Sequence, residues 1–113
     1  MSNITVPTEL LGSYTELFVA THACPAAAWT DWDISASVPA GAVAVDVLVR
    51  INTIDDRVGL RTNGSAISRL TPSATYPVGT MIVFTVKLDS TRIIEQYNTT
   101  NGGNSFNIIG YWS

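Results

Sequence analysis

Apolar and mixed positions alternate at the centre of the chain, between a Pro-Ala-Gly turn at residues 39–41 and an Asn-Gly pair at residues 63–64. Strand side chains point to opposite faces of a sheet in turn, so every second residue faces the same way. The positions that are apolar throughout are Val43, Val45, Val47, Val49 and Ile51. The opposite positions are mixed, because they include Asp46 and Arg50. This pattern predicts a strand that packs on a core from one side, as in an antiparallel sheet.

Further short runs of strand-forming residues follow, each bounded by turn residues, and no segment of useful length has the periodicity of a helix. The Asn-Gly pair is the strongest short-range signal for a hairpin, so we expect a hairpin there. The other expected strands cover residues 4–6, 14–21, 29–38, 58–62, 81–88, 92–97 and 106–112. About eight strands at such spacing predict an all-β fold. We expect an antiparallel β-sandwich with jelly-roll-like connections, and a small β-barrel is the alternative.

The same alternation divides two of these strands into faces. Trp32, Ile34 and Ala36 fall on one face of residues 29–38. Phe106, Ile108 and Gly110 fall on one face of residues 106–112, with Ile109 and Tyr111 on the other. We expect Trp32 to be a core residue.

The chain of 113 residues has the size of one domain and can bury one core without a metal or a disulfide. Residues 14–113 are expected to form a single β-sandwich domain. Residues 1–13 are expected to form an N-terminal arm that contains Leu10 and Leu11 and reaches a neighbouring subunit.

The charge content excludes some classes of partner. Only 13% of the residues are charged and the net charge is −3, against roughly 25% charged residues in typical soluble domains. No basic cluster is present, which argues against binding to nucleic acid. No apolar run approaches the ~20 residues of a membrane helix, and no secretory signal precedes the first strand. We therefore expect synthesis in the cytosol, and a neutral surface that is buried against partners.

No combination of residues assembles a recognisable catalytic centre. Cys24 has no second cysteine to pair with, and His22 has no obvious carboxylate or amide to orient it. Asp31 and Asp33 share a strand face, and residues 55–56 are two Asp in a corner, but neither pair has the ligand number of a calcium site. Zinc-ligand spacing and phosphate-binding loops are also missing from the sequence. We predict that the protein is not an enzyme and holds no metal or cofactor.

Aromatic side chains are the remaining candidates for binding. Trp29, Tyr97 and Trp112 have less certain environments than Trp32 and, with Leu10 and Leu11, form the candidate interaction surface. Exposed aromatic rings can stack on sugars, so a glycan is one candidate ligand of a lectin-like module. Glu95 is expected to form a surface ion pair with the nearby Arg92.

Four segments resemble small all-β virion proteins of tailed bacteriophages, namely capsid decoration (cement) proteins and β-sandwich modules of tails or fibres. They are the strand after the turn at residues 38–41, the Val-Gly-Leu-Arg-Thr-Asn-Gly-Ser run at residues 58–65, and the two last strands at residues 93–98 and 106–112. The resemblance covers roughly residues 38 to 113 and carries no catalytic or binding motif.

This resemblance implies a structural role in a virion. The expected protein binds the outside of a capsid as a homo-oligomer, a dimer or trimer, and stabilises the shell through contact with the major capsid protein or another virion protein. A host-recognition module on a tail or fibre that binds glycan is the alternative. Both imply a virion location after synthesis in the host cytoplasm, and neither implies a membrane or nucleic-acid partner.

Overall fold

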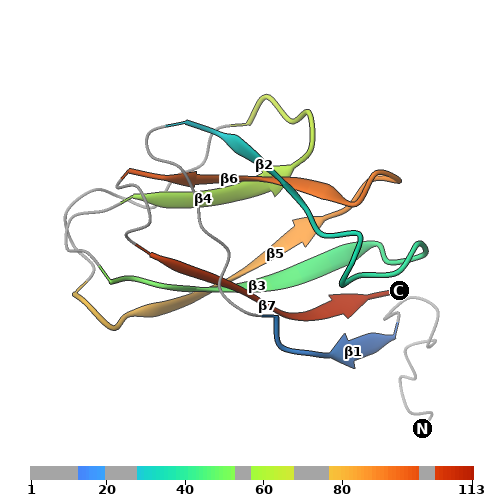
Figure 1. Cartoon of the computed structure of the whole chain (residues 1–113), viewed down its shortest axis with the longest axis horizontal. Coiled ribbons are helices and arrows are strands. Elements are labelled where there is room, and N and C mark those ends of the chain that lie inside the picture. Colours follow the sequence, from blue (N-terminus) through green and yellow to red (C-terminus); the bar gives the residue numbers. More distant parts are fainter. Residues whose placement is uncertain (1–12, 20–27, 53–56, 68–76, 100–103) are drawn as a thin grey trace, which may run out of the picture.

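The computed structural model describes residues 13–19, 28–52, 57–67, 77–99 and 104–113. They form seven strands and no helix, in two antiparallel sheets that face each other (Figure 1). The larger sheet has the order β1-β7-β3-β5 and the smaller one the order β2-β6-β4. The strands are β1 (Tyr14–Glu16), β2 (Thr30–Asp33), β3 (Ala44–Arg50), β4 (Val58–Thr62), β5 (Met81–Lys87), β6 (Ile93–Asn98) and β7 (Ser105–Trp112).

This arrangement confirms the expected all-β fold with antiparallel sheets. The described residues form two facing sheets, which is the arrangement of a β-sandwich. Two separate sheets do not form the closed strand ladder of the alternative barrel. In the larger sheet β3 pairs with β5 on one side and β7 on the other.

The core lies between the two sheets and is lined by the inward face of β3. The side chains of Val45, Val47, Val49 and Ile51 are completely buried, as the alternation predicted. Phe106 and Ile108 from β7 lie beside them, and Trp32 and Ile94 come from the smaller sheet. Burying one such aliphatic side chain contributes roughly 1.5–3 kcal/mol.

The structure corrects the predicted core face at Val43, because this side chain is 56% exposed. β3 begins at Ala44, and the backbone of Val43 joins two other strands. Its N–H donates to Trp112 O (2.7 Å), and its carbonyl accepts from Leu88 N (2.9 Å). The alternation therefore stops where the regular strand stops, and the half-buried Ala42 contacts the core instead.

A β-bulge in β7 corrects the second predicted face. Asp46 pairs with Gly110 and Val47 pairs with Ile108, so one step along β3 matches two steps along β7. The extra residue, Ile109, reverses the alternation on its C-terminal side. Tyr111 consequently packs against the core, whereas Gly110 turns to the outer face of the sheet.

Gly110 lies under an aromatic ring that a side chain at this position would displace. A Cβ atom at this position would lie only 2.0 Å from the Tyr14 hydroxyl oxygen. The Tyr14 ring also contacts Trp112, its neighbour in register, with 4.7 Å between ring centroids. An aromatic residue that covers a strand glycine restores the packing that the glycine lacks.

Two predicted strands are shorter in the structure. β1 ends at Glu16, although Leu17 N and Val19 N still donate to Ile109 O and Ile108 O of β7. β2 ends at Asp33, and the chain then turns because Ser37 N and Val38 N both donate to Ile34 O. Ala36 is exposed on this turn, so the predicted strand face ends before it, whereas Trp32 is buried as expected and Ile34 is buried too.

The Asn63–Gly64 pair forms a turn, but no hairpin is seen in the part of the chain that the structure describes. Gly64 has φ 74° and Ser65 N donates to Thr62 O (3.0 Å). Residues 65–67 are not in a strand, and β4 pairs with β6, which follows it much later in sequence. Sheet pairing here is decided by the core and not by the local turn.

Ser13 and Ser113 exchange two backbone hydrogen bonds, of 3.1 and 2.9 Å, beyond the β1–β7 pairing. The segment of the expected arm before Ser13, the expected strand at residues 4–6 and the acidic pair at residues 55–56 lie outside the described residues.

We expect Val47→Asp to abolish folding, because an unpaired charge in the core costs several kcal/mol, about 4 or more. The matched control is Val43→Asp, the same substitution at an exposed position that borders β3. Thermal unfolding followed by circular dichroism measures both. A cooperative unfolding transition in Val47→Asp near that of Val43→Asp would contradict the assigned core face.

Candidate functional site

An aromatic–ionic cluster formed by Trp29, Arg61, Glu95 and Tyr97 lies on the outer face of the smaller sheet. β6 is the central strand of this sheet, and its even residues Ile94, Gln96 and Asn98 are buried inward. Its odd residues therefore face outward. Glu95 is in register with Asp31 of β2 and Arg61 of β4, and Tyr97 is in register with Gly59.

The two aromatic rings of this cluster are in contact. The centroids of Trp29 and Tyr97 are 5.5 Å apart and their planes are inclined by 54°. The Arg61 guanidinium carbon lies over the Trp29 ring, 4.1 Å from its centroid, in a cation–π arrangement. One face of Trp29 is thus occupied by Arg61, and the rings do not form a single flat platform.

Besides the indole ring, a carboxylate and a backbone carbonyl hold the Arg61 guanidinium. Its Nε donates to Glu95 Oε1 at 2.6 Å, and its Nη1 donates to the carbonyl of Ile67 at 3.2 Å. The second oxygen of Glu95 accepts from Gly64 N at 2.8 Å, which ties the turn after β4 to β6. The Arg61 and Glu95 side chains are only 18% and 12% exposed. A pair this well covered is fixed more firmly than an exposed surface ion pair.

The hydrogen bonds and the positive charge around Glu95 favour its ionised state. Burial raises the pKa of Glu95, but the hydrogen bonds from Gly64 N and Arg61 and the positive charge of Arg61 together outweigh it. The pKa of Glu95 consequently lies below its ordinary value. The cluster therefore presents a fixed charge pair beside two aromatic rings, which suits binding by stacking and hydrogen bonds.

The predicted interaction residues divide between two faces of the molecule. Trp29 and Tyr97 meet, as described, but Trp112 lies on the outer face of the larger sheet against Tyr14. Leu10 and Leu11 lie outside the described residues. The five residues therefore do not form one surface within the described structure.

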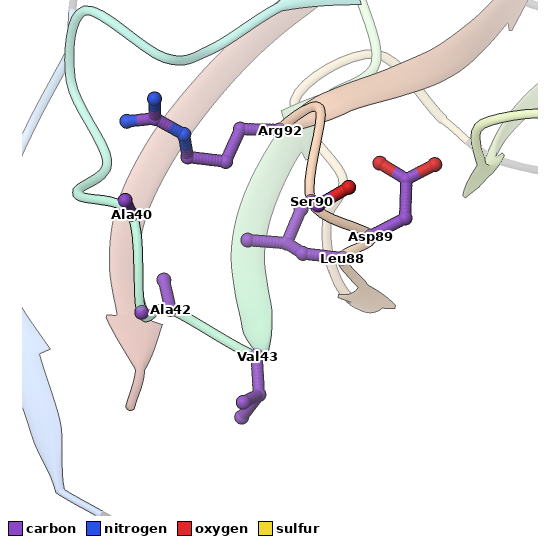
Figure 2. Close-up of a pocket in the computed structure, with 8 residues that line it drawn as sticks. Ala40, Ala42, Val43, Leu88, Asp89, Ser90 and Arg92 are labelled. Atoms are coloured by element: carbon purple, nitrogen blue, oxygen red, sulfur yellow. The ribbon is translucent and has the colours of Figure 1, made fainter.

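A surface pocket of about 420 Å³ lies at one end of the sandwich, between the turn before β3 and the turn before β6 (Figure 2). Small apolar groups from Ala40, Ala42, Val43 and Leu88 form its walls. Figure 2 shows the Asp89 carboxylate directed away from Ala40 and Ala42. The pocket can accept an apolar side chain of a partner.

The polar residues beside this pocket hold the two turns in place. Arg92 has φ 55°, and its Nη1 donates to Val38 O (2.8 Å) and Ser35 O (3.2 Å). Asp89 Oδ1 accepts hydrogen bonds from the Thr91 hydroxyl and from Thr91 N (3.0 Å), and these bonds, the hydroxyl bond foremost, lower the pKa of Asp89. The expected ion pair between Arg92 and Glu95 was therefore wrong, because Glu95 pairs with Arg61 and Arg92 binds backbone carbonyls.

Other candidate groups are dispersed. Asp31 and Asp33 are exposed on β2. A hydrogen bond from the Ser35 side chain and a second one from Ser35 N (2.9 Å) lower the pKa of Asp33. His22 and Cys24 lie outside the described residues. Within the described ranges, no three histidine, cysteine or acidic side chains gather as metal ligands, and no helix is long and apolar enough to cross a membrane.

Arg61 and Glu95 are the functional candidates that sequence reasoning missed. They are 34 residues apart and meet because β4 pairs with β6. Alternation alone places both on the outer face of their strands, but it does not say which strands are neighbours. A correct strand order would have identified the pair.

Comparisons of the chain with protein-family models, with curated proteins and with solved structures found no match.

We expect Glu95 to make stability depend on pH on the acid side. Because its folded-state pKa is depressed, its stabilising contribution is present above the ordinary glutamate pKa of about 4.3 and is lost as pH falls through the folded-state value. Glu95→Gln should remove this part of the pH dependence, and Arg61→Met should reduce it. Urea unfolding at several pH values between neutral and acidic measures the effect. Identical profiles for the wild type and Glu95→Gln would contradict it.

Proposed function

We propose that this chain is a structural virion protein of a tailed bacteriophage. In this proposal it is a capsid decoration protein that binds the outer shell as a homo-oligomer and stabilises it. It is made in the host cytoplasm, acts without catalysis, metal or cofactor, and contacts the major capsid protein or another virion protein. Nucleic acid and membrane are not among its proposed partners.

The observation that carries this proposal is a set of exposed apolar side chains on the outer face of the larger sheet. Met81 and Val83 of β5 are 59% and 54% exposed, and Leu48 of β3 lies beside Val83 in register. Phe18 is 72% exposed. Its neighbours Leu17 and Val19 pack against the core, so the Phe18 side chain points away from the core. Exposed apolar side chains gathered on one sheet favour an interaction site there.

The low charge supports the same function. Because only 13% of the residues in the chain are charged, a neighbouring protein can cover the surface at a small desolvation cost. The apolar pocket at the end of the sandwich offers a further place for a partner side chain. None of these features requires a small-molecule substrate.

We also propose the jelly-roll-like connections expected from the sequence. The strand orders β1-β7-β3-β5 and β2-β6-β4 support them, because successive strands along the chain lie in different sheets from β1 to β4 and from β5 to β7. A jelly roll has two four-stranded sheets whose strands alternate between the sheets in this way. One strand beside β4 would complete that pattern. Residues 68–76, which lie between β4 and β5 in sequence, are outside the described residues.

Sedimentation of the purified protein with empty phage capsids tests the proposed function. We expect saturable co-sedimentation, and a reduced release of shell protein on heating. Deletion of residues 1–12 should leave the unfolding transition intact and weaken shell binding, as expected of an arm. Protein that stays in the supernatant with every capsid tested would contradict the decoration function.

A second candidate function is binding of host glycan by a tail or fibre module. The contact between Trp29 and Tyr97 favours it, because aromatic rings supported by a fixed Arg–Glu pair can stack on a sugar and hydrogen-bond its hydroxyl groups.

A glycan array tests this second function. If the aromatic–ionic cluster binds sugar, Tyr97→Ala should lower the affinity at least tenfold, which corresponds to about 1.4 kcal/mol. Trp112→Ala, on the other sheet, is the control that should retain binding. Absence of any bound glycan, or equal losses in the two variants, would contradict this candidate.

A further inference from the structure

β5 has an open edge in the described structure. It is the last strand of the larger sheet and pairs there with β3 alone. Leu88 N donates to Val43 O and Ile51 N donates to Thr80 O, so the even residues of this segment direct their backbone groups toward β3. Because these groups alternate along an antiparallel strand, the N–H and C=O groups of Met81, Val83 and Thr85 point to the open edge.

This edge has few of the features that prevent strand pairing. Natural edge strands are commonly short, bulged, or interrupted by proline or inward-pointing charge. β5 has seven residues, an unbroken register with β3, no proline, and one charged residue at its end, Lys87. The inward side chains of Ile82 and Phe84 are only half-buried, although both contact the core.

We propose that β5 pairs with β5 of a second copy, antiparallel, about a two-fold axis at Val83. The two larger sheets then become one continuous sheet in a homodimer. This inference specifies the self-association contained in the proposed function and rests on it to that extent.

The register follows from the one backbone group at the edge that is already occupied. Thr62 Oγ1 of β4 donates to the carbonyl of Lys87 at 2.7 Å. Among the pairings that leave Lys87 outside the ladder, one pairs all three of Met81, Val83 and Thr85, and it places Val83 opposite the partner's Val83 and Met81 opposite the partner's Thr85. The outward N–H and C=O groups of Met81, Val83 and Thr85 are then all hydrogen-bonded in both copies.

Side-chain packing agrees on both faces of the joined sheet. On the outer face, Leu48 and Val83 of each copy form one apolar row across the axis, since Leu48 is in register with Val83. On the inner face, Phe84 lies opposite the partner's Ile82. A pair of aromatic and β-branched residues is among the favourable cross-strand pairs, and it covers the two side chains that the monomer leaves half-buried.

The charges are complementary in the same register. Asp46 is in register with Thr85 and accepts its hydroxyl hydrogen bond (2.7 Å), whereas Arg50 is in register with Met81. Each outer row therefore carries the acid of one copy and the base of the other, three strand spacings or roughly 14 Å apart. Lys87 lies opposite the partner's Gly79, which has no side chain. A second copy of this chain is thus the occupant that fits the edge.

Sedimentation equilibrium of the full chain and two variants tests the pairing. Val83→Pro removes an N–H that points to the open edge and not to β3, a position where an edge strand tolerates proline. Val83→Thr is the matched control, because it keeps the N–H and the β-branch. We expect the mass of two chains for the wild type and Val83→Thr, and of one chain for Val83→Pro with an unchanged circular dichroism spectrum. A monomeric wild type, or a dimeric Val83→Pro, would overturn the inference.

Cross-linking provides a test that does not depend on the folding of the proline variant. Directly opposed residues of a hydrogen-bonded pair have Cα atoms about 5.5 Å apart, within the range of a disulfide. In a Cys24→Ser background, Val83→Cys should give a covalent dimer on mild oxidation, and the equally exposed Val78→Cys should not. Equal cross-linking of both variants would count against the pairing.

The outcomes separate this inference from the proposed function. A dimer that persists in Val83→Pro and still co-sediments with shells overturns only the β5 interface. A dimer that Val83→Pro dissociates but that never binds shells overturns only the decoration function. Dissociation by deletion of residues 1–12, with no effect of Val83→Pro, would assign the contact to the arm and overturn the pairing of β5 with itself.

Discussion

The inward face of β3 is the constraint on which the rest of the structure depends. This strand pairs with a neighbour on each edge, and its apolar side chains fill the middle of the core. A shift of one residue would place Val45, Val47 and Val49 in water and Asp46 in the core. The register of β3 is therefore strongly specified, and β5 and β7 inherit their positions from it. The smaller sheet then closes over the face that they form together.

The fold was predictable from the sequence wherever a regular strand runs, and it was mispredicted where the backbone departs from regularity. Strict alternation correctly assigned Val47 and Trp32 to the core. It failed at Val43, which precedes the strand, and at Tyr111, which follows a bulge. A bulge adds one residue without a distinctive sequence signal, so every later position changes face. The Asn63–Gly64 turn illustrates a further limit, because a correct local turn does not specify which strand lies beside it.

The candidate site was partly predictable for the same reason. Trp29 and Tyr97 were recognisable as aromatic residues without a clear place in the core, but their contact depends on the pairing of β2 with β6. Arg61 and Glu95 are ordinary surface residues in the sequence and become a well-covered pair only because β4 lies on the other side of β6. Long-range pairing in an all-β protein is a property of the whole topology, so local patterns supply the members of such a site without supplying the site.

The position of β7 has a consequence for how the protein forms during translation. β7 lies between β1 and β3, yet it is the last strand in sequence. The pairing of residues 14–16 with residues 110–112 therefore spans almost the whole chain. While the ribosome is still adding residues, β3 and β5 can pair, but β1 has no neighbour. The larger sheet is completed only after synthesis of residues 105–112. An all-β topology with such distant contacts folds slowly, so the nascent chain keeps apolar strands accessible to chaperones until residues 105–112 have left the exit tunnel.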